Sequence, residues 1–303
     1  MTFRSPAPLA PLLALASCLL TPLAAGAAGP KLPAGLLAYH EKAGSQTDIF
    51  VSADGGVTAR NLSLHPAEDL APRLSPDGAS VVYQSTRAGK SHLFVVGVSG
   101  GITPTQLTSG PTIDQAPCWS ADGRTIYFES HRGTAWQICK VGVLGGDVTM
   151  LGPAGHDALA PRVSPDGTRI ACQLRKEGSE VWRVGLLDGE GKLIWEAAAE
   201  TSEFNETPSF SADAKDVLFA ASGPDGYQFW SMATTGKGQP RQLTRFAGWK
   251  LHPLAVGSGN LLLFDEKTPA GWRLCLFDLS TGGHAVLDSA HDRFQPDFRA
   301  TER

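Results

Sequence analysis

One proline returns at nearly constant intervals along this chain. The six copies are Pro72, Pro117, Pro161, Pro208, Pro253 and Pro296, so the spacings are 45, 44, 47, 45 and 43 residues. A period of this length is typical of repeat architectures, in which each repeat is one supersecondary unit that buries its apolar face against its neighbours. The period therefore restricts the chain to an array of similar small units.

Within each repeat, short runs of strand-forming residues alternate with turn residues. Three of the prolines are followed by a Ser-Pro/Ala-Asp-Gly sequence, at residues 75–78, 120–123 and 164–167, which suits a type I turn. Apolar runs come next, at residues 81–83, 126–128, 170–172, 217–219 and 261–263, and two further runs complete each repeat. Because no segment with helical periodicity competes with these runs, we predict an all-β fold, a six-bladed β-propeller with four-stranded blades.

The two ends of the repeated region are complementary. The first apolar run, at residues 36–38, has the position of a second strand, and residues 294–298 supply a first strand with no further strands after it. We therefore expect the C-terminal strand to join the N-terminal blade and close the ring, which leaves no inner edge for another chain to pair with. The predicted propeller domain covers residues 29–303.

The best-preserved repeats have several recurring positions. Residues 71–89 read Ala-Pro-Arg-Leu-Ser-Pro-Asp-Gly, an apolar run and then Ser-Thr-Arg-Ala-Gly, and residues 117–133 and 161–174 are similar. These repeats resemble those of the TolB-like propeller family. The resemblance implies a six-bladed propeller, whereas function does not follow from the fold. Periplasmic TolB carries an extra α/β domain before its propeller, and here we expect the propeller without that domain, because only a few residues separate the predicted signal peptide (residues 1–28) from the first predicted strand.

Residues 1–28 are predicted to be a secretory signal peptide. Arg4 is followed by a long uncharged stretch rich in leucine, which ends at the small residues 25–27 (Ala-Gly-Ala). Two alternatives stay open. Residues 15–18 (Leu-Ala-Ser-Cys) resemble the bacterial lipobox, which would make the chain a lipoprotein anchored at Cys18, and the apolar stretch is also long enough for an uncleaved membrane anchor. We predict a periplasmic or secreted protein that is attached to a membrane only if it carries such an anchor.

Charge and cysteine content exclude several classes of partner. Lysine and arginine number 26 against 30 aspartate and glutamate residues, a net charge of −4, and no basic cluster is present, so we expect no nucleic-acid partner. The cysteines form no C-x-x-C pair, and most align with aromatic residues of other repeats, so they are expected to be small buried core residues. We predict no metal, no cofactor and a monomeric chain.

Polar residues gather in the connections that lead into the inner strands. In a propeller these connections, and those between the second and third strands, surround one mouth of the central channel. The candidate binding rim consists of Asp69, Arg87, Asp114, His131, Arg132, His156, Asp157, Arg175, Glu206, His252, His291 and Asp292. The alternative is that these are solvated loop residues, with the aspartates making local Asx-type hydrogen bonds.

Two functions from different classes fit this pattern. The first is an exported, non-enzymatic binding module that presents a polar channel mouth to a protein or polymer of the cell envelope. The alternative is a carbohydrate-active enzyme, a polysaccharide lyase or hydrolase, that uses rim histidines and carboxylates. The enzyme hypothesis requires His156, His252 and His291 to lie close together beside an acidic residue, whereas dispersed histidines favour the binding module. No catalytic residue is assigned, because the G-x-S-x-G match at residues 97–101 precedes a predicted strand instead of the helix that the motif requires.

Overall fold

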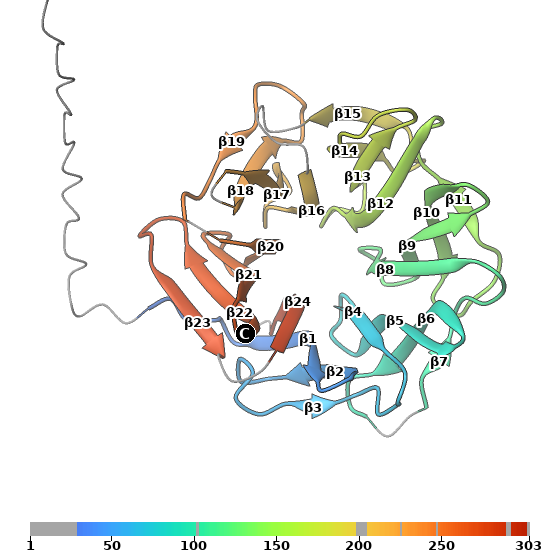
Figure 1. Cartoon of the computed structure of the whole chain (residues 1–303), viewed down its shortest axis with the longest axis horizontal. Coiled ribbons are helices and arrows are strands. Elements are labelled where there is room, and N and C mark those ends of the chain that lie inside the picture. The colour runs from blue at the N-terminus through green and yellow to red at the C-terminus, as the bar shows by residue number, and fades with distance from the viewer. Residues whose placement is uncertain are drawn as a thin grey trace, which may run out of the picture.

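The computed structural model describes residues 29–100, 103–197, 205–224, 226–246, 248–288 and 292–301. In these ranges the regular structure consists of 24 β-strands, which form six four-stranded antiparallel sheets arranged in a ring (Figure 1). The predicted all-β, six-bladed propeller is therefore confirmed. The predicted signal peptide, Cys18 and His291 lie outside the described residues. Within the described ranges, no helix is long and apolar enough to cross a membrane.

Each blade extends from an inner strand near the ring centre to an outer strand at its edge (Figure 1). Blade 1 contains β24 (Asp292–Ala300), β1 (Gly35–Ala43), β2 (Gln46–Ser52) and β3 (Arg60–Asn61). Blade 2 contains β4 (Asp69–Leu74), β5 (Ser80–Ala88), β6 (Lys90–Gly97) and β7 (Thr105–Gln106). Blade 3 contains β8 (Ile113–Trp119), β9 (Thr125–Arg132), β10 (Ala135–Gly142) and β11 (Thr149–Leu151).

The other three blades repeat this order. Blade 4 contains β12 (His156–Val163), β13 (Arg169–Lys176), β14 (Arg183–Asp188) and β15 (Leu193–Ala197). Blade 5 contains β16 (Asn205–Phe210), β17 (Asp216–Gly223), β18 (Gly226–Ala233) and β19 (Arg241–Gln242). Blade 6 contains β20 (Lys250–Val256), β21 (Leu261–Thr268), β22 (Gly271–Asp278) and β23 (His284–Asp288).

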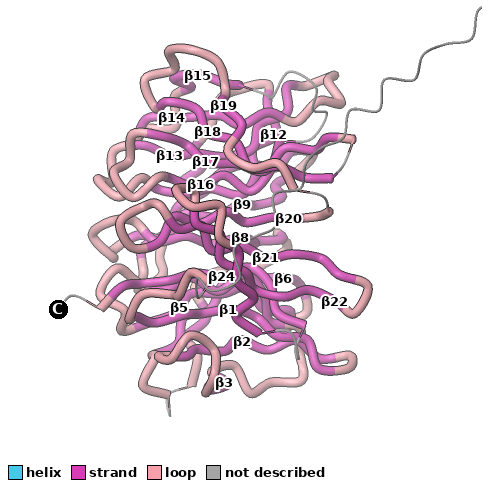
Figure 2. Tube along the Cα trace, turned by 90° about the vertical axis from the view of Figure 1, so that its left-hand side faces the viewer, coloured by secondary structure: helices cyan, strands magenta, loops and turns pink. Residues whose placement is uncertain are grey.

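The strands run between two faces of the disc, seen edge-on in Figure 2. We call the face that carries the turns between first and second strands, such as residues 75–79, the turn face. The opposite face, the loop face, carries the beginnings of the inner strands and the hairpins between second and third strands, such as residues 132–135. Because the inner strands all begin on the loop face, equivalent residues of the six repeats form a ring around the same axis.

The last strand closes the ring, as predicted. β24 pairs antiparallel with β1, for example Leu37 opposite Phe298 and Gly35 opposite Ala300. A side chain at Gly35 would place its Cβ 2.3 Å from the carbonyl oxygen of Arg299, so this position requires glycine for the close approach of the two strands. The first and last described strands therefore belong to one blade.

The repeating proline lies at a bulge in every inner strand. The register of each inner strand with its neighbour shifts at this point, as between Leu70 and Arg73 in β4. The residue before the proline has positive φ in all six blades: Ala71, Ala116, Ala160, Thr207, His252 and Gln295. This conformation is unfavourable for a non-glycine residue. Where the contacts are defined, a side chain of the preceding blade accepts the backbone N–H of this residue, as Gln84 Oε1 does for Ala116 at 2.9 Å, which offsets part of the strain.

Apolar side chains from facing sheets pack between neighbouring blades. One cluster combines Leu93 of blade 2 with Trp119 and Phe128 of blade 3. Burial of a side chain such as Phe128, which is fully buried, stabilises a protein by about 1.5–3 kcal/mol relative to exposure. The described cysteines are buried free thiols, in agreement with their predicted place in the core: Cys118, Cys139, Cys172 and Cys275.

Candidate functional site

The candidate rim residues that the structure describes come from the elements that form the loop face. The acidic residues lie at or near the beginnings of the inner strands, and the arginines lie at the ends of the second strands. The structure brings several of them together in pairs within single blades. It does not bring them into one cluster.

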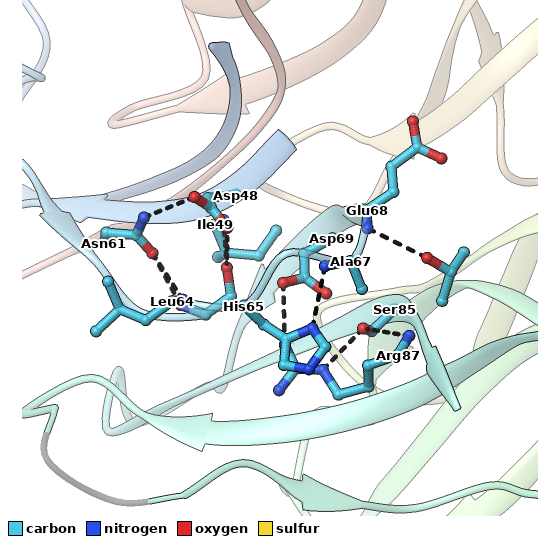
Figure 3. A network of polar contacts seen from close by, with 12 residues as sticks. Asp48, Ile49, Asn61, Leu64, His65, Ala67, Glu68, Asp69, Ser85 and Arg87 are labelled. Atoms are coloured by element: carbon cyan, nitrogen blue, oxygen red, sulfur yellow. Dashed lines mark hydrogen bonds and ion pairs between the residues drawn. The ribbon is translucent and has the colours of Figure 1, made fainter. Parts of the chain in front are cut away.

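Asp69 and Asp114 are fully buried. Arg87 Nη2 donates to Asp69 Oδ2 at 2.9 Å, a contact visible in Figure 3. Ser130 Oγ donates to Asp114 Oδ1 at 2.6 Å, and Nδ1 of His92, from the preceding blade, lies 3.3 Å from Asp114 Oδ2. Burial raises the pKa of Asp69, although its hydrogen bonds and Arg87 act in the opposite direction. The contacts of these two carboxylates give them a structural role within and between blades.

In two other blades, the position equivalent to Asp69 and Asp114 carries a positively charged side chain. Three residues before the proline, where blades 2 and 3 have Asp69 and Asp114, blade 6 has Lys250 and blade 1 has Arg293. Lys250 Nζ lies 3.3 Å from a Glu266 carboxylate oxygen, and Arg293 Nε donates to Glu41 Oε2 at 2.9 Å. Both cations are buried. The ring position therefore accommodates a buried charged side chain of either sign with a partner, and a continuous ring of carboxylates does not form.

His156, Asp157 and Arg175 lie together beside a pocket of about 410 Å³ between blades 3 and 4. Arg175 Nη2 donates to Asp157 Oδ2 at 2.7 Å, and the other carboxylate oxygen accepts the backbone N–H of Trp136 at 2.9 Å. His156 Nε2 lies 3.7 Å from a Glu196 carboxylate oxygen. The pKa of Asp157 is lowered: burial acts to raise it, but the hydrogen bonds from Arg175 and Trp136 outweigh burial.

His252 lies deeper, at the bulge of β20. Its Nδ1 is 2.7 Å from Asp265 Oδ1 and its Nε2 is 3.2 Å from Gln295 Nε2. The cavity beside it, between the inner strands at the level of the prolines, has about 10 Å³, room for at most one water molecule. His156 and His252 line two different cavities that have no lining residue in common, so these two histidines do not converge.

The other described rim residues also have partners. Glu206 accepts a hydrogen bond from Tyr227 at 3.0 Å, and Asp292 accepts the backbone N–H of Trp272 at 2.6 Å. Arg132 Nε donates to Ser130 Oγ at 3.1 Å, and the His131 ring packs edge-on against Trp136 with centroids 5.1 Å apart. The described rim is therefore a set of separate, locally paired groups.

An aromatic surface on the loop face was not predicted from the sequence. It consists of Trp249, Lys267 and Trp272 of blade 6, with the buried ring of Tyr227 from blade 5 packed against Trp249. The rings of Tyr227 and Trp249 are 5.4 Å apart, and Lys267 Nζ lies 5.7 Å from the Trp249 ring and 5.8 Å from the Trp272 ring. Trp249 is 53% exposed. A signal is present in the repeats, because Trp136, Trp182, Tyr227 and Trp272 all lie at the beginning of, or just before, a third strand.

One group of side chains has the composition of a metal site. Ligand atoms of Glu266, Cys275 and His284 lie within 4.8 Å of one another. However, Glu266 already pairs with Lys250 at 3.3 Å and accepts from Arg273 Nε at 2.9 Å. Two cations beside the only carboxylate disfavour a further positive ion. Burial also raises the pKa of the Cys275 thiol to about 12, which opposes formation of the thiolate that binds metals.

Comparisons with solved structures give the same fold. TolB from Acinetobacter baumannii superposes with a TM-score of 0.74 at 18% sequence identity, over 90% of this chain and 68% of that one. A structure assigned to TolB from Agrobacterium tumefaciens gives 0.67 at 17% identity, over 88% and 92%. A puromycin-hydrolyzing peptidase from Mycobacterium tuberculosis gives 0.57 at 16% identity, over 88% of this chain and 49% of that one. At these identities the likeness shows the fold alone.

No curated protein sequence matches the chain significantly. A family model does: residues 33–249 match the model of the TolB beta propeller domain. This match spans more than half of the chain and includes the bulged, proline-containing inner strands of blades 2 to 5. The chain belongs to the TolB beta propeller domain family.

Proposed function

We propose that this chain is an exported, non-enzymatic binding module whose loop face contacts a protein or polymer of the cell envelope. The aromatic surface of Trp249, Lys267 and Trp272, supported from below by the buried Tyr227 ring, carries the proposal. Tryptophan and tyrosine combine a large apolar area with a polar group and are enriched at the energetic centres of binding interfaces. An exposed tryptophan held by a neighbouring ring and a lysine is the kind of rigid anchor that such interfaces use.

The paired rim residues support binding over catalysis. Each described candidate is held by an ion pair, a hydrogen bond or a ring contact, so the loop face is preorganised and loses little entropy when a partner binds. A glycoside hydrolase requires two carboxyl groups about 5–10 Å apart with a sugar between them. The cavity beside His252 has about 10 Å³, which does not accommodate a sugar ring. In the larger pocket beside His156, the Asp157 carboxylate is already paired with Arg175. The separation of His156 from His252 also favours the binding module.

Export rests on the predicted signal peptide. Mass spectrometry of the protein purified from its native cells tests this part of the proposal. A mature chain that begins near residue 29 supports the cleaved signal, whereas a diacylated N-terminal Cys18 supports the lipoprotein. A chain that retains its first residues and lies in the cytoplasm contradicts export.

The binding role is tested by cross-linking and capture of envelope components on the purified propeller. Trp249→Ala removes the exposed anchor of the loop face. Leu144→Ala is the matched control, because Leu144 is a 97% exposed apolar residue in the connection between β10 and β11 on the turn face. We expect a saturable partner whose capture falls at least about tenfold with Trp249→Ala and is unchanged with Leu144→Ala. Equal capture by both variants, or no saturable partner, contradicts the proposal.

A further inference from the structure

The turn face has its own channel mouth, a cavity of about 390 Å³ that is lined by inner-strand residues of all six blades. We call it the turn-face mouth. Its charged lining consists of Arg73, Arg162 and Arg299 together with Asp297, a surplus of two positive charges in a chain whose net charge is −4. A volume near 400 Å³ is within the range of small-molecule sites. The mouth is therefore a basic cavity of ligand size on a protein that is acidic overall.

Arg73 is the buried arginine of this lining. Its side chain is 5% exposed and its Nη1 donates to the carbonyl of Pro72 at 2.7 Å. Its Nε is buried and has no hydrogen-bond partner among the described residues. A buried donor without an acceptor is unfavourable. An oxyanion that reaches Arg73 would therefore form a charge-assisted hydrogen bond with Nε without breaking an existing one.

The two other arginines leave donors available at the opening. Arg162 lies at the equivalent position of blade 4 and uses Nη1 to donate to the carbonyl of Pro161 at 2.9 Å. Arg299 is exposed. The single carboxylate of the lining, Asp297, accepts the backbone N–H of Leu74 at 2.8 Å, which orients it toward its neighbouring strand.

The turn face also carries carboxylates outside the mouth. They belong to aspartates in the turns between first and second strands. Each of these aspartates accepts one hydrogen bond from the serine two residues earlier and another from the backbone N–H two residues later, as Asp122 does from Ser120 and Arg124. The same arrangement holds for Asp77, Asp166 and Asp213. These groups are satisfied locally, and the residues that line the mouth do not include them.

We propose that the turn-face mouth binds a compact organic oxyanion through Arg73, Arg162 and Arg299. Carboxylates match the planar fork of arginine, and they reach such a cavity either on a small free acid or on the acidic side chains of a peptide. The site lies on the face opposite the aromatic surface. It is therefore independent of the proposed partner of the loop face, and either proposal can fail without the other.

The experiment is calorimetric titration of the purified propeller at low ionic strength with two carboxylate sources, succinate and a blocked diglutamate peptide. Succinamide, which has the same shape without charge, is the ligand control. Arg162→Gln and Arg299→Gln each remove one charge from the mouth. Arg245→Gln removes an exposed charge from the loop face and is the protein control. Circular dichroism establishes that each variant is folded.

We expect saturable binding of at least one carboxylate source, no binding of succinamide, and an affinity about tenfold lower for each mouth variant but unchanged for Arg245→Gln. Tighter binding of the peptide assigns the site to an acidic segment of a partner, and tighter binding of succinate assigns it to a free acid. Absence of saturable binding by either source, or equal affinity in all the variants, overturns the proposal. If Arg162→Gln does not fold, the exposed Arg299 carries the test alone.

Discussion

Replacement of Glu129 by glutamine is expected to stabilise the propeller at alkaline pH. Glu129 in β9 accepts the backbone N–H of Ala160, the positive-φ residue of the next blade, at 2.7 Å. Burial raises the pKa of its carboxyl from 4.5 to about 7. The equivalent positions of blades 2 and 4 already carry Gln84, whose Oε1 accepts the same type of N–H, and Gln173, whose Nε2 donates to the carbonyl of Asn205 at 3.3 Å. Glutamine therefore suits this position.

The magnitude follows from the pKa difference. A folded-state pKa above the unfolded value means that the folded protein binds more protons between about pH 4.5 and 7, so stability is lost as the pH rises through this window. A difference of about 2.5 pH units corresponds to ~3 kcal/mol. Partial solvent access of the Glu129 side chain screens part of this effect, so we expect ~2 kcal/mol in favour of the glutamine variant at about pH 8 and almost none at about pH 4.5.

The assay is urea denaturation followed by tryptophan fluorescence, with wild type and variant compared at each pH. The comparison is necessary because His40 also makes the stability of the protein depend on pH. Burial lowers the pKa of His40 to about 3. His40 therefore destabilises the protein as the pH falls below 6.5, with the sign opposite to that of Glu129. Its contribution is common to both proteins and cancels in the difference. A glutamine variant that is less stable than wild type at about pH 8, or a difference independent of pH, would refute the reasoning.

Three other predictions concern the ring positions, the closure and the thiols. Asp114→Asn should lower the free energy of unfolding by ~2 kcal/mol, because it breaks a fully buried network. Asp157 is partly exposed, so Asp157→Asn should lower it by ~1 kcal/mol or less. Thermal unfolding of both variants measures the two losses, and equal losses contradict the role of burial. Truncation after residue 288 removes β24 and should abolish the cooperative unfolding transition in calorimetry, and a retained transition argues against closure by this strand. Burial raises the pKa of Cys118 and Cys275 to about 12, so an aromatic disulfide reagent should react with them only after unfolding, and rapid labelling of the native protein would show that they are accessible.

The fold was predictable because its main signal is local. A proline must lie where a strand lacks a ladder hydrogen bond, and in each blade it lies at the bulge of the inner strand. Its period therefore gives the number of blades, and the Ser-Pro/Ala-Asp-Gly turns give the position of the second strands. Local signals of this kind require no knowledge of how the blades pack.

The candidate rim was less predictable because it depends on packing between blades. Asp114 is a loop residue by sequence, but the neighbouring blade covers it and supplies His92 as a contact. The proline period aligns Asp69 with Lys250, but the sequence does not show that both side chains are buried and paired within their own blades. The turn-face mouth depends on residues that follow the prolines, and whether Arg73 lines a cavity is decided by the curvature of the whole ring.

From the pairing of β24 with β1 we also expect an order of events during folding. Blades 2 to 6 are each formed from contiguous segments, so their contacts are local and can form early. Blade 1 pairs β1 with β24, so it is incomplete until β24 has been synthesised. Until then β1 has an unpaired backbone edge that a strand of another molecule can occupy. Closure is thus the late step of folding, and the interval before it is the period in which the chain is most exposed to misassembly.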